Sequence, residues 1–219
     1  MIEKELAKPV VEWLEAQHWE VYQEVRFTPQ GGIADICAVR DNKLWILETK
    51  TSLTFTVLEQ ANNWRSHFRS IAVPYARHNR DSRKFAYDIA YRYLKLGIIS
   101  VFMGNVVEEK PAPLMRDFHR YAKSMMKRLL PEHKHYCEAG AANGGYYTPY
   151  RSTMDQVKRY IQQNPGCLLK EIMDSLDHHH YSNDKTARSC IRIALSKWES
   201  GWCRTENDGN VQRYFIEVL

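Results

Sequence analysis

Residues 33–50 read IADICAVRDNKLWILETK and predict a β-hairpin, because two β-rich runs flank a tight Asp41-Asn42 turn. The two-residue period of a strand places Glu48 and Lys50 on one face of the second run, with Asp35 on the partner run. Burying such charges costs on the order of several kcal/mol unless they pair or bind a metal. Two carboxylates beside an ammonium group can hold a hard cation, polarise a phosphate and activate water.

The pattern around this hairpin predicts an α/β fold with a mixed central sheet. Helical spacing alternates with short apolar runs in the order α-β-β-β-α-β-α-β, which is typical of helices layered on a sheet. The predicted helices cover about 2–17, 54–69, 82–95 and 115–130. The predicted strands cover 20–27, 33–39, 43–49, 71–74 and 98–103, with a short edge strand at 106–109.

A second domain is predicted after residue 150. Residues 138–150, EAGAANGGYYTPY, lack apolar periodicity and are interpreted as a linker between domains 1–137 and 151–219. The C-terminal part predicts three helices and a closing hairpin, the order of a small winged helix-turn-helix module. These elements cover about 152–163, 168–176, 183–199, 202–205 and 211–218.

Composition limits the class of protein. The 219 residues carry a net charge of +5, distributed as −3 over residues 1–50, +8 over 51–137 and zero over 138–219. An acidic opening followed by a basic stretch suits a metal-ligand cluster beside a surface that meets polyanions. Five cysteines without a CxxC pair disfavour a disulfide scaffold or a zinc ribbon. No apolar run approaches the ~18 residues of a membrane span, and the N-terminus lacks a secretory core, so a cytoplasmic protein without membrane contact is expected.

The hairpin and its neighbours resemble the PD-(D/E)XK nuclease superfamily over residues 1–104, with Ala34 in place of the motif proline. The resemblance implies a restriction-endonuclease-like αβββαβ core and a metal-dependent DNA endonuclease. Asp35 and Glu48 would hold Mg²⁺, with Mn²⁺ as a substitute, together with the Thr49 carbonyl. Lys50 would position the attacking water, help to deprotonate it and stabilise charge on the phosphate.

Further site residues come from the flanking helices. Family members often add an acid from the first helix. In this helix Glu3 falls on the apolar face that points toward the sheet, and Glu5 falls on the solvent-exposed face. Glu24 on the first strand is the substitute candidate for this third acid. Gln60 matches the position of a glutamine that orients water or phosphate in parts of the superfamily. The basic residues that follow it, Arg65 and Arg69, are expected to contact DNA.

The C-terminal module is the predicted DNA-targeting part. Its third helix presents a basic face opposite an apolar stripe of Ala187, Cys190, Ile191, Ala194 and Trp198. The expected DNA contacts are Lys185, Arg188 and Arg192 on the helix, with Arg204 and Arg213 flanking the wing. Because this segment is net neutral, docking of a protein partner stays an alternative, and a homodimer is compatible with the sequence.

The domain order resembles the nuclease subunit of Tn7-like transposases. Two other functions remain open: a non-catalytic DNA-binding or assembly protein that retains a nuclease-like fold, and a winged-helix regulator whose N-terminal domain binds a partner.

Overall fold

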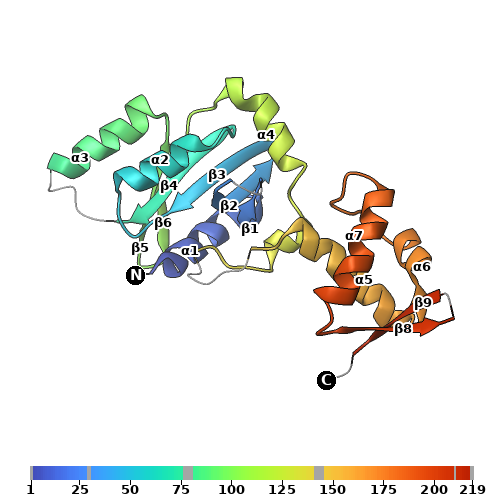
Figure 1. Cartoon of the computed structure of the whole chain (residues 1–219). Helices are drawn as coiled ribbons and strands as arrows, with labels where there is room; N and C mark the ends of the chain where they lie inside the picture. The colour runs from blue at the N-terminus through green and yellow to red at the C-terminus, as the bar shows by residue number, and fades with distance from the viewer. Residues whose placement is uncertain (1, 29–30, 76–80, 141–145, 210, 218–219) are drawn as a thin grey trace. The chain divides into compact units, whose positions relative to one another are not determined.

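The structure is a computed structural model that describes residues 2–28, 31–75, 81–140, 146–209 and 211–217 (Figure 1). The chain divides into two compact units, Met1–Tyr147 and Thr148–Leu219. No helix among the described residues is both long and apolar enough to cross a membrane.

The first unit is built on a six-stranded mixed sheet with the order β1-β2-β3-β4-β5-β6 (Figure 1). The β3–β4 and β4–β5 pairs are parallel and the other pairs are antiparallel. The strands are β1 (Glu20–Arg26), β2 (Ile33–Arg40), β3 (Lys43–Thr49), β4 (Phe68–Pro74), β5 (Gly97–Phe102) and β6 (Asn105–Lys110). The helices are α1 (Glu3–Glu15), α2 (Phe55–Asn63), α3 (Asp81–Asp88) with a π-helical continuation η1 (Ile89–Tyr93), α4 (His119–Met126), and the 3-10 turns η2 (Arg116–Phe118) and η3 (Pro131–Lys134). The predicted α/β class with a mixed central sheet is confirmed.

Helices cover both faces of this sheet. Trp45 and Leu47 of β3 belong to the apolar cluster that contains α1, whereas Leu44 and Ile46 belong to a cluster that contains part of α4. This alternation is the two-residue period of a strand buried on both faces. The last residues of the central strand β3 therefore lie at one end of the sheet, with helices packed on both faces.

The β2–β3 hairpin forms around the tight Asp41-Asn42 turn that the sequence predicts. Arg40 pairs with Lys43 across a turn in which Asp41 and Asn42 have φ values of 51° and 57°. Two successive left-handed residues are typical of the turn that matches the twist of a two-residue hairpin. The pairing continues to Ile36 opposite Leu47.

Two predicted helices are shorter in the structure. α2 ends at Asn63 rather than near residue 69, because Trp64 adopts an extended backbone with ψ 135° and the chain then enters β4. The helix expected over 115–130 is regular only from His119 to Met126. The first difference matters for the site, because Arg69 lies on a strand and not on a helix.

The second unit is a helical cluster with a small sheet of order β7-β9-β8. Its elements are α5 (Pro149–Gln163), β7 (Cys167–Leu168), α6 (Leu169–Asp174), α7 (Asp184–Lys197), β8 (Cys203–Asp208) and β9 (Val211–Ile216). Leu195 completes the buried stripe of α7, while Trp198 is 68% exposed. The prediction that Trp198 belongs to the stripe is wrong, since it follows the helix as its C-cap.

The described residues of the segment 138–150 belong to the two units themselves, either packed in the first or beginning α5 of the second. Ala139 and Tyr147 are only 1% and 4% exposed, and α5 already begins at Pro149. Residues 141–145 lie outside the described residues. The first unit therefore extends past residue 137, because the buried Ala139 and Tyr147 belong to it.

Candidate functional site

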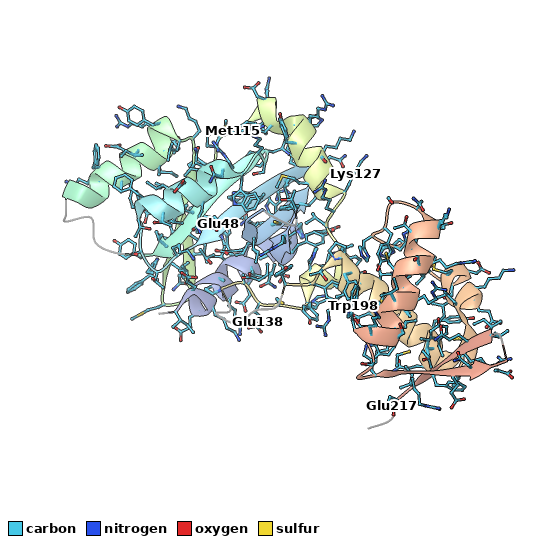
Figure 2. All side chains as sticks on the ribbon, in the orientation of Figure 1. Glu48, Met115, Lys127, Glu138, Trp198 and Glu217 are labelled. Atoms are coloured by element: carbon cyan, nitrogen blue, oxygen red, sulfur yellow. The ribbon has the colours of Figure 1, made fainter. Side chains whose placement is uncertain are left out.

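The hairpin brings Asp35 and Glu48 to the same end of the β2–β3 pair. By the register of the paired residues, Asp35 stands opposite Glu48, one step beyond Ile36 and Leu47. Asp35 Oδ2 accepts hydrogen bonds from the Thr49 amide at 2.7 Å and from the Thr49 hydroxyl at 2.9 Å. Glu48, labelled in Figure 2, is 3% exposed and lies where β3 ends. Its Oε1 accepts a hydrogen bond from the Trp64 indole at 2.6 Å.

Lys50 and Glu3 form a pair beside these two acids. The Lys50 ammonium lies 3.0 Å from both carboxylate oxygens of Glu3, so the first turn of α1 reaches the residue that follows β3. The Lys50 amide donates to the Ala72 carbonyl at 3.0 Å, which fixes its backbone against β4. Both side chains keep about a third of their surface, 30% for Lys50 and 33% for Glu3.

Burial dominates the electrostatics of this cluster. It raises the pKa of Glu48 to about 9, and the nearby Asp35 charge adds to the effect. Burial also raises the pKa of Asp35, against the two hydrogen bonds from Thr49. Burial alone would lower the pKa of Lys50, but its bond to Glu3 and the charges around it raise that pKa instead. The cluster thus holds more carboxylate than one ammonium group neutralises.

Glu24 is a fourth acid next to this group. It is 8% exposed, its backbone has φ 51°, and its Oε1 accepts a hydrogen bond from the Gly140 amide at 2.8 Å. Burial raises its pKa to about 7, while the Gly140 amide works in the opposite direction. The bond to Gly140 had no signal in the sequence, because residues 138–150 lack any periodic pattern.

The donor set fits a hard divalent cation. Carboxylate oxygens are the ligands that Mg²⁺ prefers, and one or two of them suffice because water and substrate phosphate complete the shell. As the side chains lie, no three His, Cys, Asp or Glu residues within the described ranges form a ready metal-binding group. The reason is visible in the contacts: Glu3 engages Lys50, and Glu48 engages Trp64. Asp35 and Glu48 are the pair that could bind such an ion.

Of the flanking residues predicted for this site, Arg69 is buried in other contacts, and Gln60 and Arg65 are exposed. The predicted phosphate contact of Arg69 is wrong: the side chain is buried at 4% exposure, and its guanidinium donates to the carbonyls of Asn62 and Leu94. Gln60 is exposed on α2, while Trp64 is the residue of this region that contacts an acid. Arg65 is exposed and stacks over the Tyr121 ring at 4.7 Å.

The second unit carries an exposed basic face on α7. Lys185, Arg188 and Arg192 all lie exposed along this helix, which begins at an Asn183 cap. The two wing arginines are engaged locally, since Arg204 pairs with Glu206 and Arg213 pairs with Asp208 at 3.1 Å.

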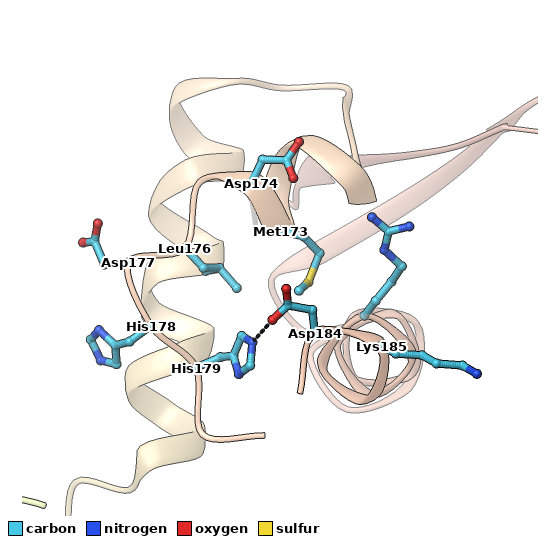
Figure 3. A pocket seen from close by; sticks show the side chains of 9 residues that line it. Met173, Asp174, Leu176, Asp177, His178, His179, Asp184 and Lys185 are labelled. Atoms are coloured by element: carbon cyan, nitrogen blue, oxygen red, sulfur yellow. Dashed lines mark hydrogen bonds and ion pairs between the residues drawn. The ribbon is translucent and has the colours of Figure 1, made fainter. Parts of the chain in front are cut away.

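A cavity of about 650 Å³ lies at the beginning of α7 (Figure 3). Lys185 and Arg188 line it together with Asp174, Asp177 and Asp184, and Asp184 accepts a hydrogen bond from His179 at 3.0 Å. Its mixed charge does not favour a polyanion.

No protein-family model matches the chain, and no curated protein matches it. Among solved structures it is similar to SPO1766, a protein of unknown function from Silicibacter pomeroyi. The TM-score is 0.40 at 12% identity, over 58% of this chain and 84% of that protein. A similarity of this size is too weak to assign a fold or an activity. The chemistry of the site is therefore inferred from its residues alone.

Proposed function

We propose that the protein is a divalent-metal-dependent DNA endonuclease, with a restriction-endonuclease-like first unit and a winged-helix second unit. The observation that carries this proposal is the meeting of Asp35, Glu48 and Lys50 at one end of a buried hairpin. Burying several carboxylates is costly, and such clusters are typical of sites that carry out chemistry. The order of elements and the resemblance to the PD-(D/E)XK pattern support the same reading.

Each residue of the cluster has a distinct role in this proposal. Asp35 and Glu48 would hold Mg²⁺ or Mn²⁺, with the Thr49 carbonyl as a neighbouring oxygen donor. Such a cation supplies Lewis-acid polarisation of the phosphate and a bound water of lowered pKa. The raised pKa of Lys50 favours its charged form, which stabilises charge on the phosphate better than it accepts a proton. Thr49 holds the Asp35 carboxylate in place through two hydrogen bonds.

The second unit would bring the nuclease to DNA. The exposed face of α7 is helical, basic and accessible, as a major-groove reader requires. Arg65 of the first unit is an additional exposed cation for the DNA backbone.

The decisive experiment is cleavage of supercoiled plasmid by the full chain with Mg²⁺ or Mn²⁺ and with EDTA. We expect metal-dependent nicking by the wild type and by Lys43→Ala, and loss of nicking in Lys50→Ala. Lys43 is the matched control because it lies exposed at the opposite end of β3. Equal nicking by the wild type and Lys50→Ala would refute the assignment.

One observation favours the non-catalytic alternative. Lys50 and Glu3 satisfy each other, and Glu48 is bonded to Trp64, so the cluster could serve as a structural network. A DNA-binding or assembly protein would then bind DNA through α7 without cutting it. Titration with Mn²⁺ separates the two functions, since only the nuclease requires a cation at Asp35 and Glu48.

A further inference from the structure

The chain returns to the acid cluster after α4 and η3. Residues Glu138–Gly140, which we call the strap, run beside β1 and the first turn of α1. The Ala139 amide donates to Gln23 Oε1 at 2.9 Å, and the Gly140 amide donates to Glu24 Oε1 at 2.8 Å. Glu138, labelled in Figure 2, forms an ion pair of 2.6 Å with Lys4. Each residue of the strap therefore has a polar contact with β1 or α1.

Gly140 is fitted closely against α1. Its φ is +75°, and a Cβ at this position would lie 2.6 Å from the Glu3 carbonyl carbon and 2.7 Å from the Lys4 nitrogen. Both neighbours are backbone atoms, which cannot rotate away as a side chain can. Any residue other than glycine would push the strap and the beginning of α1 apart.

The strap contacts two of the four acids directly. It touches the backbone of Glu3, whose carboxylate holds Lys50, and it hydrogen-bonds the carboxylate of Glu24. Glu24 itself has a left-handed backbone within β1, which non-glycine residues seldom adopt. Such a conformation persists where surrounding contacts enforce it, and the Gly140 bond is one of those contacts.

We propose that the strap is a positioning element of the acid cluster, which sets the placement of Glu3 and Glu24 and thereby the affinity of the site for a divalent cation. This inference rests on the proposed function. Mg²⁺ and Mn²⁺ tolerate little distortion of their octahedral shell, so the groups beside the proposed ligands Asp35 and Glu48 must be placed closely. Groups that orient metal ligands without binding the ion typically contribute about 10-fold to 100-fold in affinity.

The test compares two glycine substitutions in the full chain. Gly140→Ala adds a methyl group against the Glu3 backbone, whereas Gly104→Ala adds one at a similar φ of +80° with no atom within 4 Å. Both variants carry the strain of a left-handed alanine, so their difference isolates the contact with α1. Calorimetry would give the Mn²⁺ affinity, the electron paramagnetic resonance spectrum of bound Mn²⁺ would report its ligand geometry, and thermal unfolding would report the fold.

We expect Gly140→Ala to weaken Mn²⁺ binding by about 10-fold to 100-fold and to change the spectrum, and Gly104→Ala to do neither. If Gly140→Ala does not fold, Gln23→Ala replaces it, because it removes only the acceptor of the Ala139 amide. Gln23→Ala should also weaken Mn²⁺ binding.

The outcomes separate this inference from the proposed function. If the wild type binds Mn²⁺ and the strap variants bind it equally well, the strap has no positioning role and the proposed function stands. An equal loss in Gly140→Ala and Gly104→Ala would also overturn the inference, since general backbone strain would explain it. A wild type that takes up no Mn²⁺ would overturn the proposed function and the role of the strap together.

Discussion

The acid cluster of the first unit and the basic face of α7 in the second unit carry their charges in opposite surroundings. Glu48 is 3% exposed and its pKa is raised by burial, whereas Lys185, Arg188 and Arg192 project from a helix surface. A buried charge is costly to the fold, while an exposed one contributes little to it. The cluster should therefore couple function to stability, and the α7 face should be changeable without loss of the fold.

The largest effect is expected from the acids and the lysine at the hairpin end. Asp35→Ala and Glu48→Ala should abolish Mn²⁺ binding and cleavage together. Lys50→Ala should retain Mn²⁺ binding but lose about 10²-fold to 10³-fold in cleavage rate, the usual contribution of one group that stabilises transition-state charge. Calorimetry and single-turnover cleavage measure the two quantities separately. Retained Mn²⁺ binding in both acid variants would place the cation elsewhere.

The next effect is on stability, and its sign follows from the raised pKa of Glu48. Between its ordinary pKa of 4.5 and about 9 the folded state binds more protons than the unfolded chain. The free energy of unfolding should therefore fall as the pH rises through this interval, by at most about 1.4 kcal/mol per pH unit. In EDTA, Glu48→Gln should be more stable than the wild type at about pH 8 and nearly equal to it at about pH 4.

Urea unfolding followed by tryptophan fluorescence measures this difference. Glu59→Gln is the matched control, because it makes the same change at an exposed position on α2. Mn²⁺ should stabilise the wild type at about pH 8 and not Glu48→Gln, since only a cation bound to the folded state adds stability. A Glu48→Gln variant that is less stable than the wild type at about pH 8 would show that the carboxylate supports the fold.

The sequence predicts the acid cluster better than it predicts the contacts that hold the cluster in place, which come from Trp64 and the strap. The reason is physical. Strand period and helical spacing are local, and they placed Asp35, Glu48 and Glu3 on faces that the structure brings to one edge. The hydrogen bond from Trp64 to Glu48 depends on where α2 ends, and the apolar spacing beyond Asn63 wrongly predicted that the helix continues. The composition of residues 138–150 predicts a linker, because backbone amides make two of the three contacts of the strap and composition carries no record of them.

The basic face of α7 should show a large effect on binding and none on folding. Lys185→Ala, Arg188→Ala and Arg192→Ala combined should weaken DNA binding and reduce its dependence on salt, by about 0.9 in the log–log slope for each phosphate that the variant no longer neutralises. A variant with the exposed Lys8, Arg159 and Lys170 changed to alanine removes the same charge elsewhere. DNA affinity at two salt concentrations distinguishes the α7 variant from this control. Equal slopes for the triple variant and the wild type would favour a protein-docking role for this helix.

The smallest effect is expected within the first turn of α1, where two acids two residues apart have different contacts. Glu3 holds Lys50 through both of its oxygens, whereas Glu5 is exposed and accepts a hydrogen bond from the Ile2 amide at the beginning of the helix. Glu3→Gln removes charge from the cluster and leaves Lys50 without its anionic partner, so Mn²⁺ affinity or turnover should fall by about 10-fold. Glu5→Gln keeps an acceptor for the helix cap and should change either quantity by less than about twofold. Calorimetric titration compares the Mn²⁺ affinities of the two variants. Both substitutions remove one negative charge from the same turn of the same helix. The reverse ranking would remove Glu3 from the site and leave Glu24, the acid bonded to the strap, as the third carboxylate.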